Sequence, residues 1–284
     1  LLVNQHRHLR YHRCDNRKAS TVKVNRCPST LRRGYDSYSP AALRKIFSGK
    51  RVNHILPFTS PESDESVQAA FLENRKRLSI SGVQLKLSLT LEKNRLRLTH
   101  EGESGLFILK PIPSDLMKVD QVPANEHLTM QLAEQVFNIE TAPNGLIFFK
   151  DDNPAYITRR IDYKPDGSKR RMEDFATLAG KTRDNAGPDF KYEAATEDLF
   201  HILKQYVGPY LIEAQKLFRL ILFNYAFSNG DAHLKNFSLL ETDDGDFILS
   251  PAYDLVCSRI HVKDGDMAFK NGMFSDDFET DSFR

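Results

Sequence analysis

The chain has 284 residues, 40% of them apolar and 27% charged, and a formal net charge of +2. It is long enough for one large core or two modest ones, which excludes a disordered tail or a peptide hormone. Its three cysteines cannot form a disulfide framework and show no metal-ligand spacing, so a reducing, cytoplasmic location is expected. The longest apolar stretch, 217–227, is well short of the roughly 20 residues that a membrane span needs, so no membrane association is expected.

Basic residues are concentrated at the N-terminus. Residues 1–26 hold seven Lys or Arg and one acidic residue, which leaves 33 basic and 37 acidic residues in the rest of the chain. Because this segment shows no apolar periodicity, residues 1–34 are predicted to form a basic irregular extension, and the natural start is expected near Val24. Its histidines and Cys14 also suggest a zinc or nucleic-acid site, which is the less favoured interpretation. Contact with DNA is expected only indirectly, through a partner.

Regular patterns begin at Ser39. With Ser39 as the cap, Pro40 at the first helical position and Gly49 as the stop, the sequence predicts a short helix. A second helical pattern covers 67–78, and the apolar period then changes to two, which indicates half-buried antiparallel strands. The strands are expected at 83–91, 96–98, 106–110, 146–149 and 156–160.

Helical patterns dominate the second half of the chain. One helix among the strands, at 125–137, is expected to present an apolar face made of Leu128, Leu132 and Val136. After Arg171 the strands are expected to stop, apart from a small hairpin. The later helices are expected at 172–179, 194–206 and 210–227, and the hairpin at 237–240 and 247–249. The fold class is therefore α+β.

The strongest local signal is the segment Asn-Gly-Asp-Ala-His-Leu-Lys-Asn at 229–236. Its Asp231 and Asn236 have the spacing of the aspartate that accepts a hydroxyl proton and the asparagine that holds Mg²⁺ in phosphoryl transfer. A second metal-binding aspartate should follow the hairpin, and Asp254 stands there. Alone, the segment could equally be a polar turn, and Asp254 makes that alternative less favoured.

Two further residues fit a site for Mg²⁺ and ATP. Lys110 ends an apolar strand, as the phosphate-binding lysine of a kinase third strand does, and Glu126 in the next helix can pair with it. Each alone is more often a solvent-exposed residue, so they count only jointly. The loop Ser-Ile-Ser-Gly-Val-Gln-Leu-Lys at 79–86 could offer backbone donors to phosphates, but with one glycine it is a weak signal.

Together these motifs resemble the HipA family of serine/threonine kinases, the toxins of bacterial toxin–antitoxin modules. The matching motifs are the loop 79–86, Phe-Ile-Leu-Lys-Pro at 107–111, Asn-Glu at 125–126, Ile-Thr-Arg-Arg-Ile-Asp at 157–162, Gly-Asp-Ala-His-Leu-Lys-Asn-Phe at 230–237 and Pro-Ala-Tyr-Asp-Leu at 251–255. The Ser-Ile-Ser pair and the short region before it are most similar to HipT, the kinase of three-component HipBST modules. The resemblance covers about residues 35–284.

The resemblance implies a protein-kinase-like fold of two lobes. The β-rich N-lobe would cover 35–162 and the mostly helical C-lobe 163–284. Because the chain ends about 30 residues after Asp254, the C-lobe is expected to be incomplete. Apolar faces of the region 194–228 would then remain uncovered.

For the reaction, the resemblance implies Asp231 as the catalytic base and Lys110 as a ligand of the ATP phosphates. Glu126 would pair with that lysine. Asn236 and Asp254 would hold Mg²⁺.

For the nucleotide, the resemblance implies that backbone groups of Arg159 and Ile161 meet the adenine. The other nucleotide-binding residues are expected to be Ser81, Gly82, Val83, Gln84, Lys86, His233 and Lys235. Ser79 and Ser81 are expected to be autophosphorylated. A phosphoserine adds a charge of about −1.5 to −2 at pH 7, which in this loop would repel ATP and switch the kinase off.

The implied function is that of an ATP-dependent protein serine/threonine kinase toxin that acts on a translation-machinery protein, such as an aminoacyl-tRNA synthetase. The implied partners are a HipB-like DNA-binding antitoxin and a HipS-like small subunit. Two alternatives stay open: a truncated, inactive kinase-like module that binds antitoxin partners, and a small-molecule phosphotransferase. The pattern Asp-X-His-X-X-Asn also occurs in aminoglycoside and choline kinases, but the Ser-Ile-Ser-Gly loop argues against that class.

Overall fold

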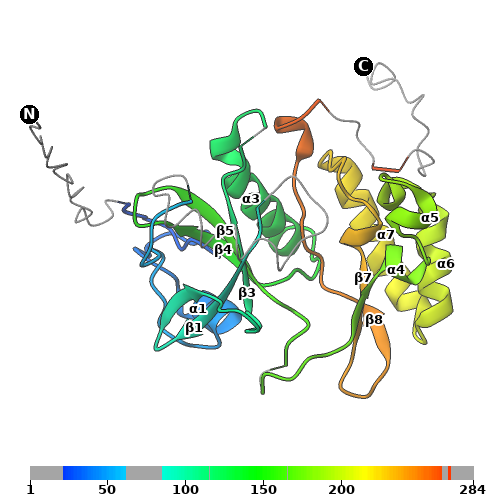
Figure 1. Ribbon diagram of the computed structural model, residues 1–284, viewed down its shortest axis with the longest axis horizontal. Helices are drawn as coiled ribbons and strands as arrows, with labels where there is room; N and C mark the ends of the chain where they lie inside the picture. Colours follow the sequence, from blue (N-terminus) through cyan, green and yellow to red (C-terminus); the bar gives the residue numbers. More distant parts are fainter. Residues whose placement is uncertain (1–21, 62–84, 115, 165, 264–267, 270–284) are drawn as a thin grey trace, which may run out of the picture.

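An antiparallel sheet forms the centre of the N-terminal lobe (Figure 1). The computed structural model describes residues 22–61, 85–114, 116–164, 166–263 and 268–269. The strands of this sheet, in the spatial order β2-β1-β3-β5-β4, are Leu87–Glu92 (β1), Arg95–Leu98 (β2), Phe107–Pro111 (β3), Asn144–Phe148 (β4) and Pro154–Arg159 (β5). The predicted hairpin is confirmed, because Glu92 pairs with Arg95 and the two turn residues, Lys93 and Asn94, both have positive φ. The predicted helix at 67–78 lies outside the described residues.

One face of this sheet packs against α1 (Pro40–Phe47), the first predicted helix. The Ser39 hydroxyl accepts a hydrogen bond from the Ala42 N–H at 3.2 Å, as expected of an N-cap. Cys27, assigned from the sequence to an irregular extension, is fully buried in the same cluster as Ile46 and Phe47. Residues 27–29 of that segment are therefore buried in the packed lobe.

The other face of the sheet packs against α3 (Val122–Gln135), which begins three residues before its predicted start. The apolar face expected for this helix was wrong, because Leu128 and Val136 are 49% and 60% exposed. The helix instead buries polar residues, among them Glu126 and His127. They are buried because the sheet offers them partners: His127 Nδ1 lies 2.9 Å from the Asn144 Oδ1 on β4.

The C-terminal lobe combines helices with a small three-stranded sheet in the order β6-β7-β8 (Figure 1). Its elements are Met172–Asp174 (β6), Phe175–Leu178 (α4), Arg183–Ala186 (α5), Phe190–Tyr192 (η2), Thr196–Tyr206 (α6), Tyr210–Ala226 (α7), Leu234–Asn236 (η3), Ser238–Glu241 (β7), Phe247–Leu249 (β8) and Ser258–Ile260 (η4). The predicted helix at 172–179 is half wrong, because β6 pairs with β7 before α4 begins. The other helices and the hairpin are confirmed.

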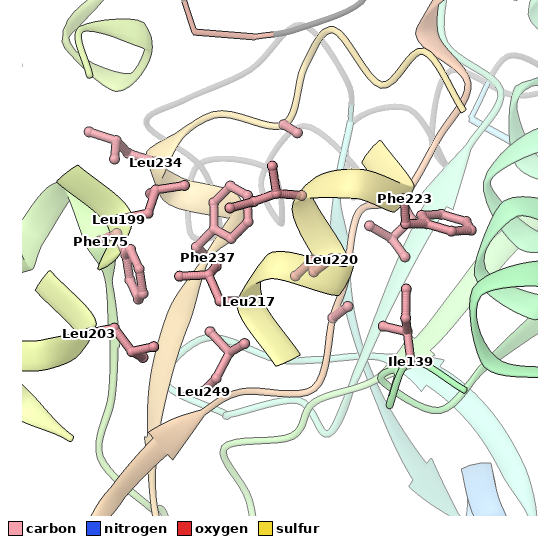
Figure 2. Packing of buried hydrophobic residues seen from close by; sticks show 14 of the residues in the cluster. Ile139, Phe175, Leu199, Leu203, Leu217, Leu220, Phe223, Leu234, Phe237 and Leu249 are labelled. Atoms are coloured by element: carbon pink, nitrogen blue, oxygen red, sulfur yellow. The ribbon is translucent and has the colours of Figure 1, made fainter. Parts of the chain in front are cut away.

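The apolar core of the C-terminal lobe extends under α3 and so joins the two lobes (Figure 2). Phe175, Leu217 and Phe237 are buried there together with Met130 of α3. The outer face of α7 stays uncovered in the described part of the chain, as expected for this region. Its large exposed apolar side chains are Leu211, Ile212, Phe218 and Leu222. None of the described helices is long and apolar enough to cross a membrane.

Candidate active site

Lys110 lies where the N-lobe sheet meets α3. Side chains alternate along β3, so Leu109 enters the α1 cluster while Lys110 points to the opposite face. There its Nζ donates to Glu126 Oε1 at 2.5 Å, and both side chains are 4% exposed. The same ammonium lies 5.3 Å from the centre of the Tyr156 ring. The predicted pair of Lys110 and Glu126 is therefore present and shielded from solvent.

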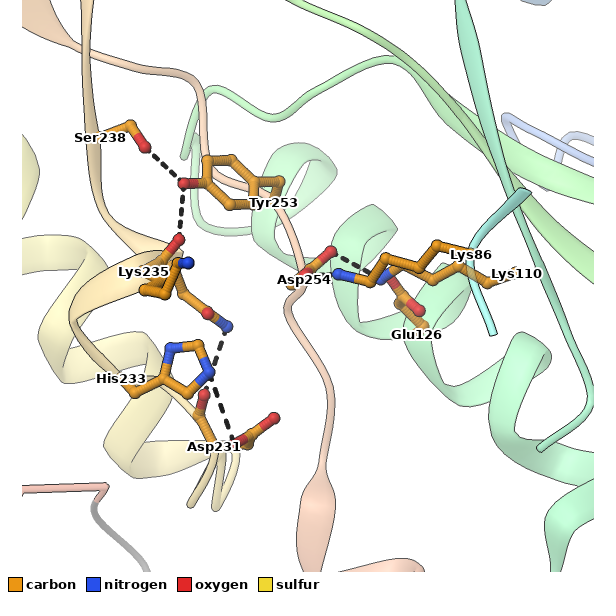
Figure 3. Close-up of polar contacts among 10 residues, drawn as sticks. Lys86, Lys110, Glu126, Asp231, His233, Lys235, Ser238, Tyr253 and Asp254 are labelled. Carbon is orange, nitrogen blue, oxygen red and sulfur yellow. Dashed lines mark hydrogen bonds and ion pairs between the residues drawn. The ribbon is translucent and has the colours of Figure 1, made fainter. Parts of the chain in front are cut away.

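Asp254 reaches the same ammonium from the C-terminal lobe (Figure 3). Its Oδ1 lies 2.5 Å from the Lys110 Nζ, and its Oδ2 accepts from the Lys86 Nζ at 3.1 Å. Asp254 has a φ of 56°, a left-handed conformation that only Gly, Asn and Asp adopt readily. This backbone conformation directs the carboxylate toward the N-terminal lobe, so four charged groups from four separate segments meet: Lys86, Lys110, Glu126 and Asp254.

The charges of this cluster keep Asp254 ionised. Burial works against charge on Asp254, but the ammonium groups of Lys110 and Lys86 hold the pKa of its carboxyl well below the ordinary value. Burial also opposes charge on Lys110, yet the carboxylates of Asp254 and Glu126 raise its pKa. The pKa of Glu126 is raised because burial outweighs the attraction of Lys110. Asp254 is therefore the stronger acid of the two.

The predicted catalytic loop lies beside this cluster, between α7 and β7. The Gly230 N–H donates to the Ser258 Oγ at 2.9 Å, which ties the loop to the segment that follows Asp254. Asp231 exposes 52% of its side chain, and Asn236 Nδ2 donates to the Asp231 carbonyl oxygen at 3.2 Å. The loop thus presents one carboxylate to solvent and fixes the asparagine amide beside it.

His233 supports the loop from inside. Its Nε2 lies 3.9 Å from the Asp231 Oδ1, and only 8% of its side chain is exposed. Burial lowers the pKa of His233 to about 4 against the attraction of Asp231, so the ring is neutral at pH 7. In this structure it lies beside Asp231, and its predicted contact with the nucleotide stays a prediction.

Tyr253 connects the catalytic loop to Asp254, its neighbour in the chain. Its Oη donates to the Lys235 carbonyl oxygen at 3.0 Å and lies 2.5 Å from the Ser238 Oγ (Figure 3). Because the phenol gives its proton to that carbonyl, Ser238 is the donor in the second bond. These hydrogen bonds hold the Lys235 backbone in place and do not involve the Lys235 side chain.

Asn125, next to Glu126, fastens the segment after Asp254 to α3. Its Oδ1 accepts from the Cys257 N–H at 3.2 Å, and its Nδ2 lies 2.9 Å from the Cys257 carbonyl oxygen. His261 adds a second link, with Nε2 2.8 Å from the Asn125 Nδ2 and Nδ1 2.9 Å from the Met117 carbonyl oxygen. The position of Asp254 is thereby set by α3 as well as by its own lobe.

Tyr192 is a site residue that the sequence did not indicate. Its Oη donates to the Asp231 Oδ1 at 2.5 Å, and its ring meets that of His233 edge-on with centroids 5.3 Å apart. The hydrogen bond joins residues 39 positions apart, and no local spacing or motif marks the tyrosine.

The residues expected to meet the adenine lie where β5 leaves the sheet. The Arg159 N–H donates to the Pro143 carbonyl oxygen at 2.8 Å. Antiparallel neighbours in such a pair normally exchange two bonds, but Pro143 has no N–H to donate to the Arg159 carbonyl. Ile161, two residues on, packs against the C-lobe core. A contact between Arg159 and adenine would thus use the carbonyl oxygen.

The phosphate loop falls outside the described residues, except at its end. Ser79, Ser81, Gly82, Val83 and Gln84 are in this group, so their predicted roles stay predictions. Lys86, the last residue of the loop, is described and contacts Asp254, as shown above.

The donor set suits Mg²⁺. Asn236 and Asp254 offer oxygen ligands, and Mg²⁺ is usually bound by one or two carboxylates together with waters and substrate phosphates. Among the described residues, no group of three or more His, Cys, Asp or Glu side chains could hold a metal by itself. The two ammonium groups on Asp254 show that its carboxylate already attracts cations. A metal here would therefore depend on phosphates for its remaining ligands.

Comparison with known proteins identifies the family. Residues 78–282 match the family described as HipA-like C-terminal domain. The chain belongs to this family. The expected HipA resemblance is thereby confirmed at the level of the family.

The curated relatives are longer than this chain. A Haemophilus influenzae protein named "Putative kinase" is 26% identical over 225 residues, which cover 77% of this chain and 63% of the relative. The Sinorhizobium fredii protein named "Putative kinase Y4mE" is 32% identical over 195 residues, which cover 63% of this chain and 42% of the relative. The HipA-like chain thus spans about half the length of the relatives it matches.

A solved structure supports the fold. A chain of the Shewanella oneidensis MR-1 complex of HipA, HipB and operator DNA superposes with a TM-score of 0.55 and 24% identity. The match covers 68% of this HipA-like chain and 47% of the other. The fold class predicted from the sequence, a kinase-like α+β fold with two lobes, is confirmed.

Proposed function

We propose that this HipA-like chain is the catalytic part of a cytoplasmic, ATP- and Mg²⁺-dependent protein serine/threonine kinase. The observation that carries the proposal is the shared ammonium of Lys110. It lies 2.5 Å from both the Glu126 and Asp254 carboxylates, and the exposed Asp231 stands in the adjoining loop. A phosphoryl-transfer site needs these parts: a cation for the phosphates, a metal-binding aspartate and a base near the acceptor.

In the proposed reaction, Asp231 accepts the proton of the acceptor hydroxyl. Lys110, held by Glu126, orients the phosphates of ATP, and Asn236 and Asp254 hold Mg²⁺. When bound, Mg²⁺ neutralises charge on the β- and γ-phosphates. The Lys86 ammonium donates to the Asp254 carboxylate. When ATP and Mg²⁺ are bound, we expect this ammonium to leave the carboxylate and to donate to a phosphate oxygen.

We further propose that the protein is the toxin of a toxin–antitoxin module and is most like HipT. The substrate would be a translation-machinery protein such as an aminoacyl-tRNA synthetase. The Shewanella complex, which contains HipB and operator DNA, supports a HipB-like antitoxin as a partner through which DNA is reached. A HipS-like subunit is proposed from the Ser-Ile-Ser resemblance, and phosphate on Ser79 or Ser81 would switch the kinase off.

The test is turnover of γ-labelled ATP with Mg²⁺ by the full chain, with label read on the protein and on purified aminoacyl-tRNA synthetases. Label on the parent, with phosphopeptides at Ser79 or Ser81, is expected. It should disappear in Asp231→Ala and persist in Asp244→Ala, which changes an exposed aspartate of the β7–β8 turn.

Each alternative predicts a different result. ATP binding by the folded chain without any turnover would favour an inactive module that binds antitoxin partners. Turnover with aminoglycosides or choline, without label on any protein, would favour a small-molecule phosphotransferase. An unmodified Ser79–Ser81 loop in an active preparation would reject the proposed self-inactivation.

A further inference from the structure

Tyr192 donates a hydrogen bond to the carboxylate of Asp231, the group proposed to act as the base. A base that removes a hydroxyl proton must lie within hydrogen-bond reach of that hydroxyl, at about 2.6–3.2 Å. The Tyr192 Oη donates to the Asp231 Oδ1 at 2.5 Å, slightly closer than that range, so the two oxygens are in direct contact. Asp231 keeps 52% of its side chain exposed, so this contact is made at an open site and not in the core.

The segment around Tyr192 is anchored, so the phenol is delivered to a set position. Phe190 packs against the C-lobe core, and the Tyr192 N–H donates to the Asp189 carbonyl oxygen at 2.8 Å. The Lys181 ammonium donates to the Glu193 carbonyl oxygen on the other side. The Tyr192 ring then packs edge-on against His233 at an interplanar angle of 74°.

The surroundings of the phenol suit a phosphate. Lys191, next to Tyr192, is close enough to Lys86 and Lys235 for their charges to lower its pKa; burial is the larger cause, and Asp231 opposes it. The tyrosine therefore lies near ammonium groups that belong to the nucleotide side of the site. A phenol also loses its proton more readily than a serine hydroxyl, so it demands less of the base.

We propose that Tyr192 is an intramolecular phosphate acceptor, modified by this chain's own site. The inference rests on the proposed kinase activity. The Tyr192 oxygen forms a bond to the γ-phosphorus of ATP, and the bond from that phosphorus to the β–γ bridging oxygen breaks, so ADP leaves. The phenol proton goes to the Asp231 carboxylate and then to solvent.

Once phosphorylated, Tyr192 cannot keep its hydrogen bond to Asp231. Phosphotyrosine has no Oη proton to donate, and its charge of about −1.5 to −2 would stand beside the Asp231 carboxylate. The segment is therefore expected to leave Asp231 after modification, which frees the base for another acceptor.

The test is phosphopeptide mapping of the full chain after incubation with Mg²⁺ and ATP. Phosphate is expected on Tyr192 and is expected to be lost completely in Asp231→Asn. Tyr206, a 40% exposed tyrosine on α6, is the internal control and should stay unmodified. Thermal unfolding and ATP binding verify that each variant is folded.

A mixing experiment tests whether the transfer is intramolecular. An isotopically labelled Asp231→Asn chain keeps Tyr192 but lacks the base. An unlabelled Tyr192→Phe chain keeps the base Asp231 but lacks the tyrosine hydroxyl. No phosphate is expected on Tyr192 of the mixture, whereas its appearance there would overturn the inference. Asp231-dependent phosphate on other residues, with none on Tyr192 of the parent, would overturn the inference and leave the kinase proposal standing. No Asp231-dependent turnover of ATP would overturn both.

Discussion

The Nζ of Lys110 and the Oδ1 of Asp254 lie 2.5 Å apart although 144 residues separate them in the chain. Lys110 comes from the central sheet of the N-terminal lobe, and Asp254 follows the last strand of the C-terminal lobe. Glu126 on α3 binds the same ammonium. One cation thus couples both lobes and the helix between them, so changes at Lys110 should affect stability and activity together.

Replacing Lys110 with Met should lower turnover and destabilise the fold. Removing one partner of a buried ion pair typically costs about 3–5 kcal/mol, because Glu126 keeps a buried charge without its cation. Removing an electrostatic contact at the reacting groups typically lowers the rate by about 10²–10³. Urea unfolding and ATP turnover measure the two effects. Lys45→Met, which breaks the partly exposed pair with Glu134, is the control and should cost about 0–1 kcal/mol.

The double variant Lys110→Met/Glu126→Gln separates the two effects. The amide carries no charge, so much of the lost unfolding free energy should return. Turnover should stay as low as in Lys110→Met, since the cation is still missing. Recovery of both quantities would show that Lys110 serves only the fold.

Replacing Asp254 with Asn should weaken Mg²⁺ binding and lower turnover while preserving the backbone. The left-handed φ of 56° is tolerated by Asn, and Lys110 keeps Glu126 as a partner. Titration of Mg²⁺ into the ATP-bound protein should show weaker binding, and turnover should fall by about 10²–10³. Asp244→Asn on the β7–β8 turn is the matched control. Unchanged Mg²⁺-dependent turnover in Asp254→Asn would contradict the assigned metal role.

His127 should make the fold less stable in acid. Burial lowers the pKa of His127 to about 4 from its ordinary value of 6.5, and the hydrogen bond with Asn144 opposes this to a smaller extent. Between these values the unfolded chain binds a proton that the folded chain does not. The contribution is therefore complete above pH 6.5 and is lost as the pH falls toward 4, by about 3 kcal/mol.

Urea unfolding of the parent and of His127→Gln between pH 7.5 and about 4.5 measures this contribution. The variant should lose less stability on acidification than the parent, because it lacks the buried His127. Both proteins keep His233, whose pKa burial also lowers. His201→Gln, at an exposed position on α6, should follow the parent curve. Parallel curves for all three proteins would contradict the prediction.

Glu213 should stabilise the contact between α7 and β8. Its Oε2 accepts from the Leu249 N–H at 3.0 Å, and its Oε1 pairs with the Lys216 ammonium at 2.7 Å. Glu213→Ala leaves that buried N–H without its acceptor, which should cost about 1–3 kcal/mol in urea unfolding. Glu213→Gln keeps an acceptor oxygen and should cost less. Glu101→Ala, at an exposed turn, should change little.

Much of the site could be predicted from the sequence because its residues stand in short motifs with regular spacing. Side-chain alternation along β3 places Lys110 on the face opposite the apolar cluster. Asp231 and Asn236 lie five residues apart in one loop, where Asn236 donates to the Asp231 carbonyl oxygen. The exposed Leu128 could not be predicted, because the buried face of α3 depends on partners such as Asn144 in the sheet. The strand β6 was missed since it exists only by pairing with β7.

The sequence by itself determined the helices, most strands and the charged residues of the site, since side-chain period and capping act over a few neighbouring residues. Tertiary structure decided which of those charges meet. It brought Lys86 and Lys110 together at the Asp254 carboxylate. It also left Asp231 partly exposed to solvent and placed the Tyr192 hydroxyl within hydrogen-bond distance of the Asp231 carboxylate. Ion pairing and burial depend on groups far apart in the chain, and no local pattern specifies them.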